Sequence, residues 1–391
     1  MEQLSERFRH AMSRQEMERR WGLLRREMEK QELDCLILHN YDNFLGGYTR
    51  YITDIPIGNY PSTVLFHRED ETTYIGHGAP WTPSVPAGMS RGIGQALATP
   101  LMPTLAYTDS YMPRLVIDEL KRRGYRRVGL VGESMIPASL CRMIHEELPQ
   151  VELVNATTMV DRIKMIKSPE EIRKLREIVH IHDMIGAAVP TIFRPGRYEY
   201  EIAADIRKMG SDLGCEGLNV MLGTGPSENP GLMLPNMQHR QVEMGDNMLC
   251  LIELSGPGGY YAELMRMWTL GEPSQALQDA TACAIECQNE VISRMKPGVN
   301  CAELLKVNND FLTARGYGPE GRMFAHSQGL DMVERPAFSA DETLTLEENM
   351  FFAVHPAAVT ESVFGAVCDN FLVTANGVER ITQTPHGVLC C

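Results

Sequence analysis

The chain has 391 residues, 43% of them hydrophobic and 23% charged, and a net charge of −14. At about 150 residues per domain, this length predicts two or three globular domains. The acidic balance argues against a nucleic-acid partner, because phosphate contacts need clustered Lys and Arg. No apolar run reaches the roughly 18 residues of a membrane span, and the charged N-terminal segment lacks the apolar core of an export signal. We therefore expect a cytoplasmic protein without a membrane partner, whose ten cysteines are free thiols.

Residues 1–160 alternate predicted strands and helices, which is typical of an α/β domain. A charged, amphipathic pattern predicts a helix over 14–31, and the pair Gly46-Gly47 predicts a turn. The charged turn 67–70 joins two predicted strands into a hairpin. The predicted strands cover 34–39, 62–66, 72–76 and 127–132, and a helix near 114–124 precedes the last of them.

Residues 161–391 combine long predicted helices with short strands. Ser168 is a predicted N-cap and Pro169 takes the first helical position, so a helix should begin here and run to about 187. The glycine-rich turn 255–259 separates two predicted strands between 248 and 270. The other expected elements are helices over 198–213, 276–295 and 301–315, and short strands between 324 and 378.

Five short motifs follow one another along this second half. They are RIKMIKSPEEI (162–172), EMGDNML (243–249), PGV (297–299), HSQGLD (326–331) and LEENM (346–350). Each is weak alone, but their order resembles the creatinase/prolidase/aminopeptidase P superfamily. The resemblance covers 161–391 well and 1–160 more loosely. It implies an α/β (α+β) protein with a creatinase-type N-terminal α/β domain over 1–160, a pita-bread catalytic domain over 161–391, and assembly as a homodimer.

The resemblance also implies a metal site. Metallopeptidases of this superfamily hold two divalent ions with two Asp, one His and two Glu. Such ions share a water molecule, lower its pKa and polarise the scissile carbonyl. The corresponding positions here are Glu253, Glu263, His326, His355 and Cys368, of which only His326 keeps the residue type of the family.

Two interpretations of these positions stay open. In one, they still bind one or two divalent ions (Zn, Fe or Mn), and the softer ligands His355 and Cys368 favour zinc, iron or copper over manganese. In the other, the site resembles that of creatinase, which runs a metal-free hydrolysis with His and Glu. Structural roles compete with both, since Arg266 is available to pair with Glu253 and Cys368 is equally consistent with a buried thiol.

The loop over 223–230 has no His, although related enzymes carry a functional His there. Its pattern, and the ten-residue spacing from Glu253 to Glu263, resemble the branch that contains a dimethylsulfoniopropionate lyase. Met332, however, occupies the position of the Asp base in that branch. The expected substrate contacts are Glu228, Asn229, His239, Tyr260 and Asp331.

Together these residues predict a hydrolase of a small polar substrate with a C–N bond, similar to creatinase or an Xaa-Pro peptidase. Glu253, Glu263 or a bound metal would activate water, and His326 would be the acid–base or ligand residue. Two alternatives stay open. A lyase acting on a sulfonium- or betaine-type acid would leave an alkene instead of consuming water. A pseudo-enzyme would bind a ligand or a peptide without catalysis.

Overall fold

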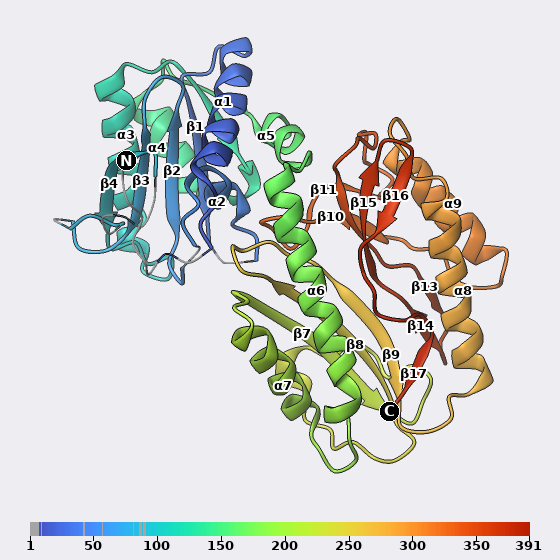
Figure 1. Cartoon of the computed structure of the whole chain (residues 1–391). Helices are drawn as coiled ribbons and strands as arrows, with labels where there is room; N and C mark the ends of the chain where they lie inside the picture. The colour runs from blue at the N-terminus through green and yellow to red at the C-terminus, as the bar shows by residue number, and fades with distance from the viewer. Residues whose placement is uncertain are drawn as a thin grey trace. The chain divides into compact units, whose positions relative to one another are not determined.

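The computed structural model describes residues 8, 10–41, 44–56, 58–80, 82–85, 88 and 91–391. The chain divides into two compact units, Met1–Lys164 and Met165–Cys391. Figure 1 follows the chain from the first unit, which begins in blue, to the second, which ends in red. Each unit has hydrophobic core clusters of its own, so each can be described by itself.

The first unit is an α/β domain built on one six-stranded sheet. Its strands follow the order β4-β3-β2-β1-β5-β6, in which β1 pairs antiparallel with β2 and parallel with β5. Its helices are α1 (Arg14–Lys30), α2 (Gly47–Thr53), α3 (Tyr111–Arg123), α4 (Ala138–Glu147) and α5 (Thr157–Lys164). Its strands are β1 (Cys35–Asn40), β2 (Ser62–His67), β3 (Thr72–His77), β4 (Ile93–Thr99), β5 (Arg127–Val131) and β6 (Glu152–Asn155).

Most predicted elements of this unit are confirmed. Helix α1 begins after Ser13, whose hydroxyl accepts a hydrogen bond from the Glu16 N–H, and β2 and β3 form the predicted hairpin. The turn predicted at Gly46-Gly47 is wrong, because Gly47 opens helix α2. The burial of Tyr51 and Ile52 on this helix outweighs the weak helix propensity of glycine.

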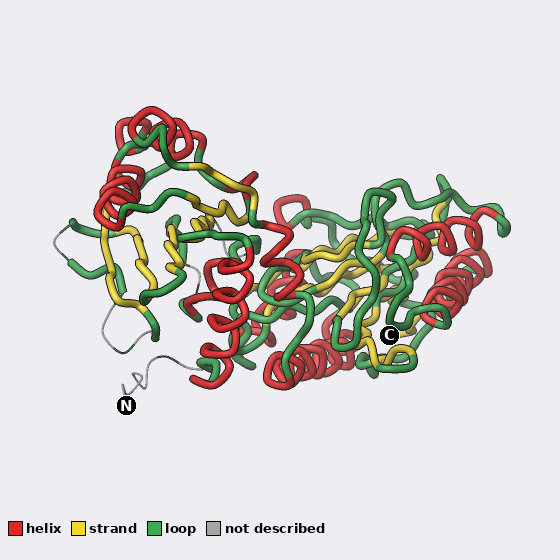
Figure 2. Tube along the Cα trace, turned by 90° about the horizontal axis from the view of Figure 1, so that it is seen from above, coloured by secondary structure: helices red, strands yellow, loops and turns green. Residues whose placement is uncertain are grey.

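The second unit contains two larger sheets. One has the strand order β17-β9-β8-β7, and the other has the order β11-β10-β12-β15-β16. Helices α6 and α7 contact the first of these sheets, whereas α8 and α9 pack together, and α8 contacts the small β13-β14 sheet (Figure 1 and Figure 2). The helices are α6 (Pro169–Ile192), α7 (Glu199–Asp212), α8 (Gln275–Ile292) and α9 (Cys301–Thr313). The strands are β7 (Gly217–Gly225), β8 (Asn247–Ser255), β9 (Leu264–Thr269), β10 (Ala325–Ser327), β11 (Glu334–Ala337), β12 (Phe351–Val354), β13 (Ala357–Val359), β14 (Phe364–Ala366), β15 (Asp369–Thr374), β16 (Gly377–Arg380) and β17 (Val388–Cys390).

The start of helix α6 is fixed by a capping box and a buried ion pair. The Glu171 N–H donates to the Ser168 hydroxyl, and the Ser168 N–H donates back to the Glu171 carboxylate, which confirms the predicted N-cap. The Lys167 ammonium lies 2.6 Å from a Glu334 carboxylate oxygen, and both side chains are buried. Because the other oxygen of Glu334 accepts the Leu330 N–H, this ion pair ties α6 to the turn after β10.

Two residues in the middle of α6 accept hydrogen bonds from segments that are distant in sequence. The Leu254 N–H of β8 donates to His182 Nε2 at 3.2 Å, and the Thr384 N–H donates to Asp183 Oδ1 at 2.7 Å. Burial lowers the pKa of His182 to about 3, so its imidazole is neutral and accepts this bond. One helix thereby keeps β8 in register with the C-terminal segment.

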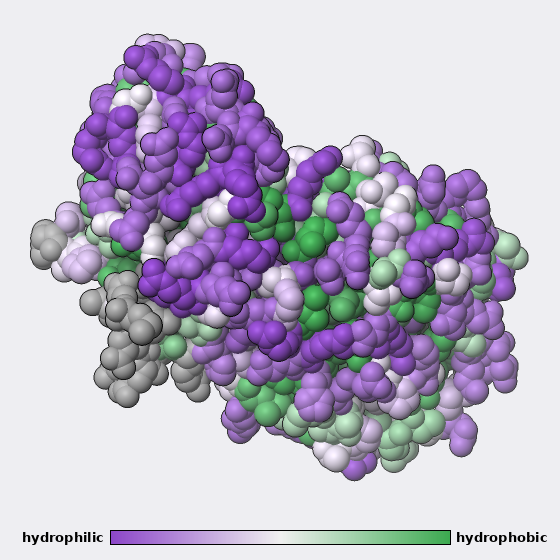
Figure 3. Space-filling view, turned by 45° about the horizontal axis from the view of Figure 1, so that its top comes forward, coloured by the Kyte–Doolittle hydropathy of each residue, from purple (hydrophilic) through white to green (hydrophobic). Residues whose placement is uncertain are grey.

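The apolar side chains gather mainly in the interior. Figure 3 shows a face on which hydrophilic residues dominate and hydrophobic residues form scattered areas. Within the described part of the chain, no helix combines the length and the apolar character needed to cross a membrane.

Two buried histidines of the first unit predict acid sensitivity. Burial lowers the pKa of His39 to about 4, and burial together with the charge of Arg123 lowers that of His67 to about 4. Both titrate near 6.5 in an unfolded chain. Between these values the unfolded chain binds protons that the folded chain excludes, so stability is full above about pH 6.5 and falls toward pH 4.

We expect the urea midpoint, followed by circular dichroism, to fall as the pH is lowered from about 7 to 4.5. The dependence on pH should be shallower in His39→Gln and in His67→Gln than in the wild type. Equal pH dependence in all three proteins would contradict the assignment.

Candidate active site

Two glutamates come together where β8 and β9 pair. The strands are antiparallel, and Ile252 lies opposite Leu264. The next residue on β8 is Glu253 and the residue just before β9 is Glu263, so this register places them side by side. Their side chains are almost fully buried, with 4% and 5% of each residue exposed. Two adjacent carboxyl groups in such a place are unfavourable when both are charged.

The same kind of pairing brings two histidines together. Strand β10 pairs with β12, and Ala325 lies opposite Val354. The His355 N–H donates to the Phe324 carbonyl at 2.7 Å, which extends the ladder past the end of β12. The imidazole ring centres of His326 and His355 are consequently 5.2 Å apart.

Among the described residues, Glu263, His326 and His355 form a group whose ligand atoms all lie within 4.8 Å of one another. His326 Nε2 is 3.5 Å from Glu263 Oε2. Burial alone raises the pKa of Glu263, but His355 and His326 lower it overall to about 2. Burial lowers the pKa of His355, which keeps its imidazole neutral. An ionised carboxylate and a neutral imidazole are the forms that bind metal, so the group fits one divalent ion.

Glu253 has a different environment. The Asn219 side-chain amide donates to its Oε2 at 3.1 Å, and the Gln328 side-chain amide donates to its Oε1 at 3.2 Å. Burial and the neighbouring Glu263 raise the pKa of Glu253 well above its ordinary value. The surroundings therefore favour the protonated form of Glu253 and the ionised form of Glu263.

Arg266 does not pair with Glu253, so the structural alternative in which these two residues form an ion pair is wrong. Side chains alternate between the two faces of a strand. Arg266 shares a face with Cys250 across the β8–β9 ladder, whereas Glu263 lies three residues earlier and faces the other way. The guanidinium lies instead 2.6 Å from Asp369 Oδ1.

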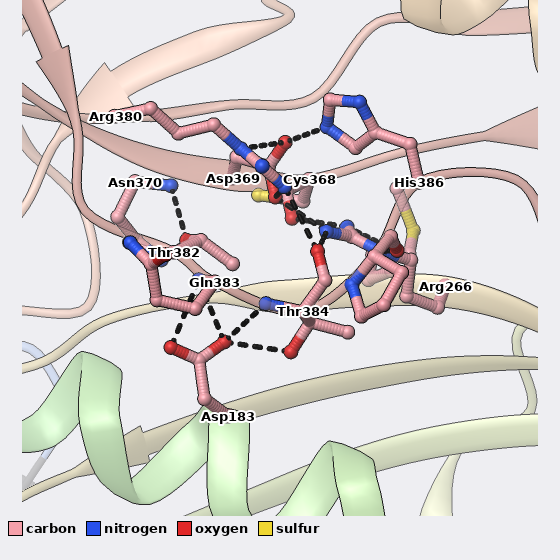
Figure 4. Close-up of polar contacts among 12 residues, drawn as sticks. Asp183, Arg266, Cys368, Asp369, Asn370, Arg380, Thr382, Gln383, Thr384 and His386 are labelled. Carbon is pink, nitrogen blue, oxygen red and sulfur yellow. Dashed lines mark hydrogen bonds and ion pairs between the residues drawn. The ribbon is translucent and has the colours of Figure 1, made fainter.

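Figure 4 shows the charged cluster around Asp369. Its carboxylate also accepts from Arg380 Nη2 at 3.1 Å and from His386 Nε2 at 2.6 Å. Burial alone raises the pKa of Asp369, but His386 and Arg266 hold it below its ordinary range. Because Asp369 opens β15, this cluster fixes the strand that runs next to β12.

Asn370 carries this rigidity to the backbone of Glu263. Its side-chain amide donates to the Glu263 carbonyl at 2.7 Å, and its side-chain oxygen accepts the Glu263 N–H at 3.2 Å. The same amide donates to the Thr382 hydroxyl at 3.1 Å. The peptide groups on both sides of the Glu263 Cα are thus held by one side chain.

Cys368 lies beside Glu263, His326 and His355, and its thiol forms a hydrogen bond with the main chain. An isolated β-bridge joins it to Met265. Its Sγ lies 3.8 Å from the Glu263 carbonyl oxygen, to which it donates. Burial and the neighbouring Glu263 raise the pKa of Cys368 well above its ordinary value, so it is a neutral thiol.

The predicted substrate contacts have varied surroundings. Tyr260 is buried and its hydroxyl donates to Glu171 of α6 at 3.0 Å. His239 is exposed and stacks on Tyr198, with ring centres 5.0 Å apart. The remaining three lie in loops, Asp331 after β10 and Glu228 and Asn229 after β7. The assignment of these residues to substrate binding stays a prediction.

Three amide side chains at the site were not singled out from the sequence: Asn219, Gln328 and Asn370. Gln328 stands two residues after His326 within the HSQGLD motif, just past the end of β10, so its closeness to His326 could be read from the sequence. Asn219 lies opposite Glu253 on β7, a strand that was not predicted. Asn370 is the second residue of β15 and follows Cys368 by two residues.

Comparisons with known proteins agree with this architecture. Residues 173–375 match the model of metallopeptidase family M24, and residues 20–166 match the creatinase/prolidase N-terminal domain. The uncharacterized hydrolase/peptidase y4tL of Sinorhizobium fredii is 25% identical, covering 95% of this chain and 96% of the relative. The Xaa-Pro dipeptidase of Pyrococcus horikoshii is 24% identical, covering 68% and 76%.

Solved structures show the same fold. The X-Pro aminopeptidase of Thermotoga maritima superposes with a TM-score of 0.82 at 21% identity, covering 95% of this chain and 99% of that one. The prolidase of Pyrococcus horikoshii gives 0.76 at 20% identity, covering 95% and 100%. These matches confirm the predicted superfamily and the creatinase-type plus pita-bread fold. The chain therefore belongs to metallopeptidase family M24 and carries a creatinase/prolidase N-terminal domain.

Proposed function

We propose that the chain is a hydrolase that breaks a C–N bond in a small polar substrate. The observation that supports this most strongly is the pair of buried, neighbouring carboxyl groups of Glu253 and Glu263, whose surroundings raise the pKa of Glu253 and lower that of Glu263. When two titratable groups in one site have pKa values pushed apart, the protonated one is suited to act as an acid and the ionised one as a base.

We assign Glu253 the role of the general acid. When a C–N bond breaks, the leaving nitrogen must take up a proton, and a buried carboxylic acid is suited to supply it. The side-chain amides of Asn219 and Gln328 hold one carboxyl oxygen each, so the group is fixed before a substrate arrives.

Glu263 orients the attacking water and accepts its proton, with His326 3.5 Å away to stabilise the ionised carboxylate. A divalent ion bound by Glu263, His326 and His355 would lower the pKa of a bound water and strengthen it as a nucleophile. Asn370 keeps the backbone of Glu263 in place, so that the carboxylate stays aimed at the water.

The relatives guide the choice of substrate. Several of them are named Xaa-Pro dipeptidases, which supports an amide next to proline as the first candidate. The changed residue types at Glu253, Glu263, His355 and Cys368 support a substrate different from theirs. Xaa-Pro dipeptides, small cyclic amides and guanidino compounds therefore form the screening set.

Replacing either carboxyl group should remove most of the activity. With a substrate from this set, we expect Glu253→Gln and Glu263→Gln to lower kcat by about 100-fold or more, which is the usual contribution of a positioned acid or base. Glu272→Gln is the matched control, because Glu272 is exposed just after β9 and should leave kcat unchanged.

Product analysis separates the competing readings. Incorporation of one oxygen from labelled water into the product supports hydrolysis. An alkene product without that label would replace the proposal by a lyase. Ligand binding without turnover in any member of the set would replace it by a binding protein.

The role of Asn370 has its own test. Asn370→Ala removes both side-chain hydrogen bonds to the Glu263 backbone, so kcat should fall by about tenfold while KM changes little. Thr382→Ala removes the hydroxyl that accepts from the side chain and the backbone N–H of Asn370 but leaves both hydrogen bonds to Glu263, so it should have a smaller effect. Equal kcat values for the wild type and Asn370→Ala, in a protein with an unchanged circular dichroism spectrum, would show that Asn370 does not position Glu263.

A further inference from the structure

We propose that this site holds one divalent ion, bound by Glu263, His326 and His355, in place of the two ions that the family resemblance implies. The inference rests on the proposed function, because it concerns the same site. It is carried by two features of the structure, namely the closeness of three ligand atoms and the hydrogen bonds that occupy Glu253.

The three ligand atoms are already near the spacing that one ion requires. Ligand atoms about 2.1 Å from a tetrahedral zinc ion lie about 3.4 Å from one another. His326 Nε2 and Glu263 Oε2 are 3.5 Å apart, and all three ligand atoms lie within 4.8 Å. Small side-chain rotations therefore suffice to close the set around an ion, and no strand has to move.

The place beside Glu253 is unsuited to a second ion. Each oxygen of Glu253 accepts an amide N–H, from Asn219 on one side and from Gln328 on the other. These N–H groups direct their positive ends at the carboxyl oxygens, where a cation would have to bind. Gln328 Nε2 is itself fixed, because it also donates to the Met332 carbonyl at 3.1 Å. To bind Glu253, an ion would have to displace both hydrogen bonds, and the two amide N–H groups would then lie close to its positive charge.

Cys368 does not complete a second ligand set. Its Sγ donates to the Glu263 carbonyl oxygen and lies outside the group of three ligand atoms found among the described residues. The sulfur therefore lies beside Glu263 as a hydrogen-bond donor to its carbonyl oxygen, and it is not one of the three ligand atoms that lie within 4.8 Å of one another.

The chemistry of the ligands selects the ion. Two imidazoles and one carboxylate favour a borderline-soft ion over a hard one such as Mn²⁺. The same combination of ligands, with a fourth position left for water, is typical of catalytic zinc. We therefore expect Zn²⁺ to bind more tightly than Mn²⁺.

Metal stoichiometry tests the proposal without a substrate. Chelator-stripped full-length protein is reloaded with Zn²⁺, passed through a desalting column and analysed by plasma mass spectrometry. We expect one equivalent in the wild type, and less than a tenth of that in Glu263→Gln and in His355→Ala. Glu253→Gln and Cys368→Ala should retain one equivalent, and circular dichroism verifies that each variant is folded.

Cobalt substitution gives a second readout that does not depend on variants. Co²⁺ in the wild type should show ligand-field bands without a thiolate-to-cobalt charge-transfer band, because Cys368 is not a ligand. Two equivalents of zinc, no bound zinc, loss of metal in Glu253→Gln, or a thiolate band would each overturn the proposal. One equivalent without turnover of any substrate would leave this inference standing and remove the proposed function, whereas turnover by a protein that binds no zinc on reloading would do the reverse.

Discussion

Two carboxyl groups placed side by side in a buried position cannot both be charged at low cost, and the site depends on this constraint. The β8–β9 register makes Glu253 and Glu263 neighbours, and their surroundings settle which one gives up its proton. Histidines beside Glu263 favour its charge, while burial beside an existing charge disfavours that of Glu253. The division of roles therefore follows from the surroundings of two chemically identical side chains.

The site forms only where three segments that are distant in sequence come together. The pairing of β10 with β12 sets the distance between the histidines, and β15 lies next to β12. The cluster of Asp369 with Arg266, Arg380 and His386 forms at the start of β15, next to Asn370, which holds the backbone of Glu263. A buried carboxylate with three cationic or donor partners is costly to disrupt, so this cluster acts as a rigid base for the ladder that carries the site.

The sequence allowed the fold to be predicted, but only part of the site. Ser168 and the residues after it form a local helix start, and local signals of this kind need no knowledge of distant partners. The motif around His326 helped to identify the superfamily, because the order of the motifs can be read directly from the sequence. The alternative in which Arg266 pairs with Glu253 could not be excluded from the sequence, because the partner of Arg266 depends on which face of β9 it occupies. Asn219 could not be assigned from the sequence, because β7 was not predicted. The position of Gln328 near His326 was visible in the sequence, but its hydrogen bond to Glu253 depends on the packing of distant segments.

The contacts made by helix α6 limit which mutations this part of the chain can accept. Its contacts with Tyr260, Leu254 and Thr384 are made by Glu171, His182 and Asp183, spread over several turns. An α-helix rotates by about 100° per residue, so one residue inserted between Glu171 and His182 would turn these contacts toward different faces. The length of this segment is therefore constrained by helical phase. Substitutions on its exposed face should be tolerated far better during evolution than any insertion or deletion.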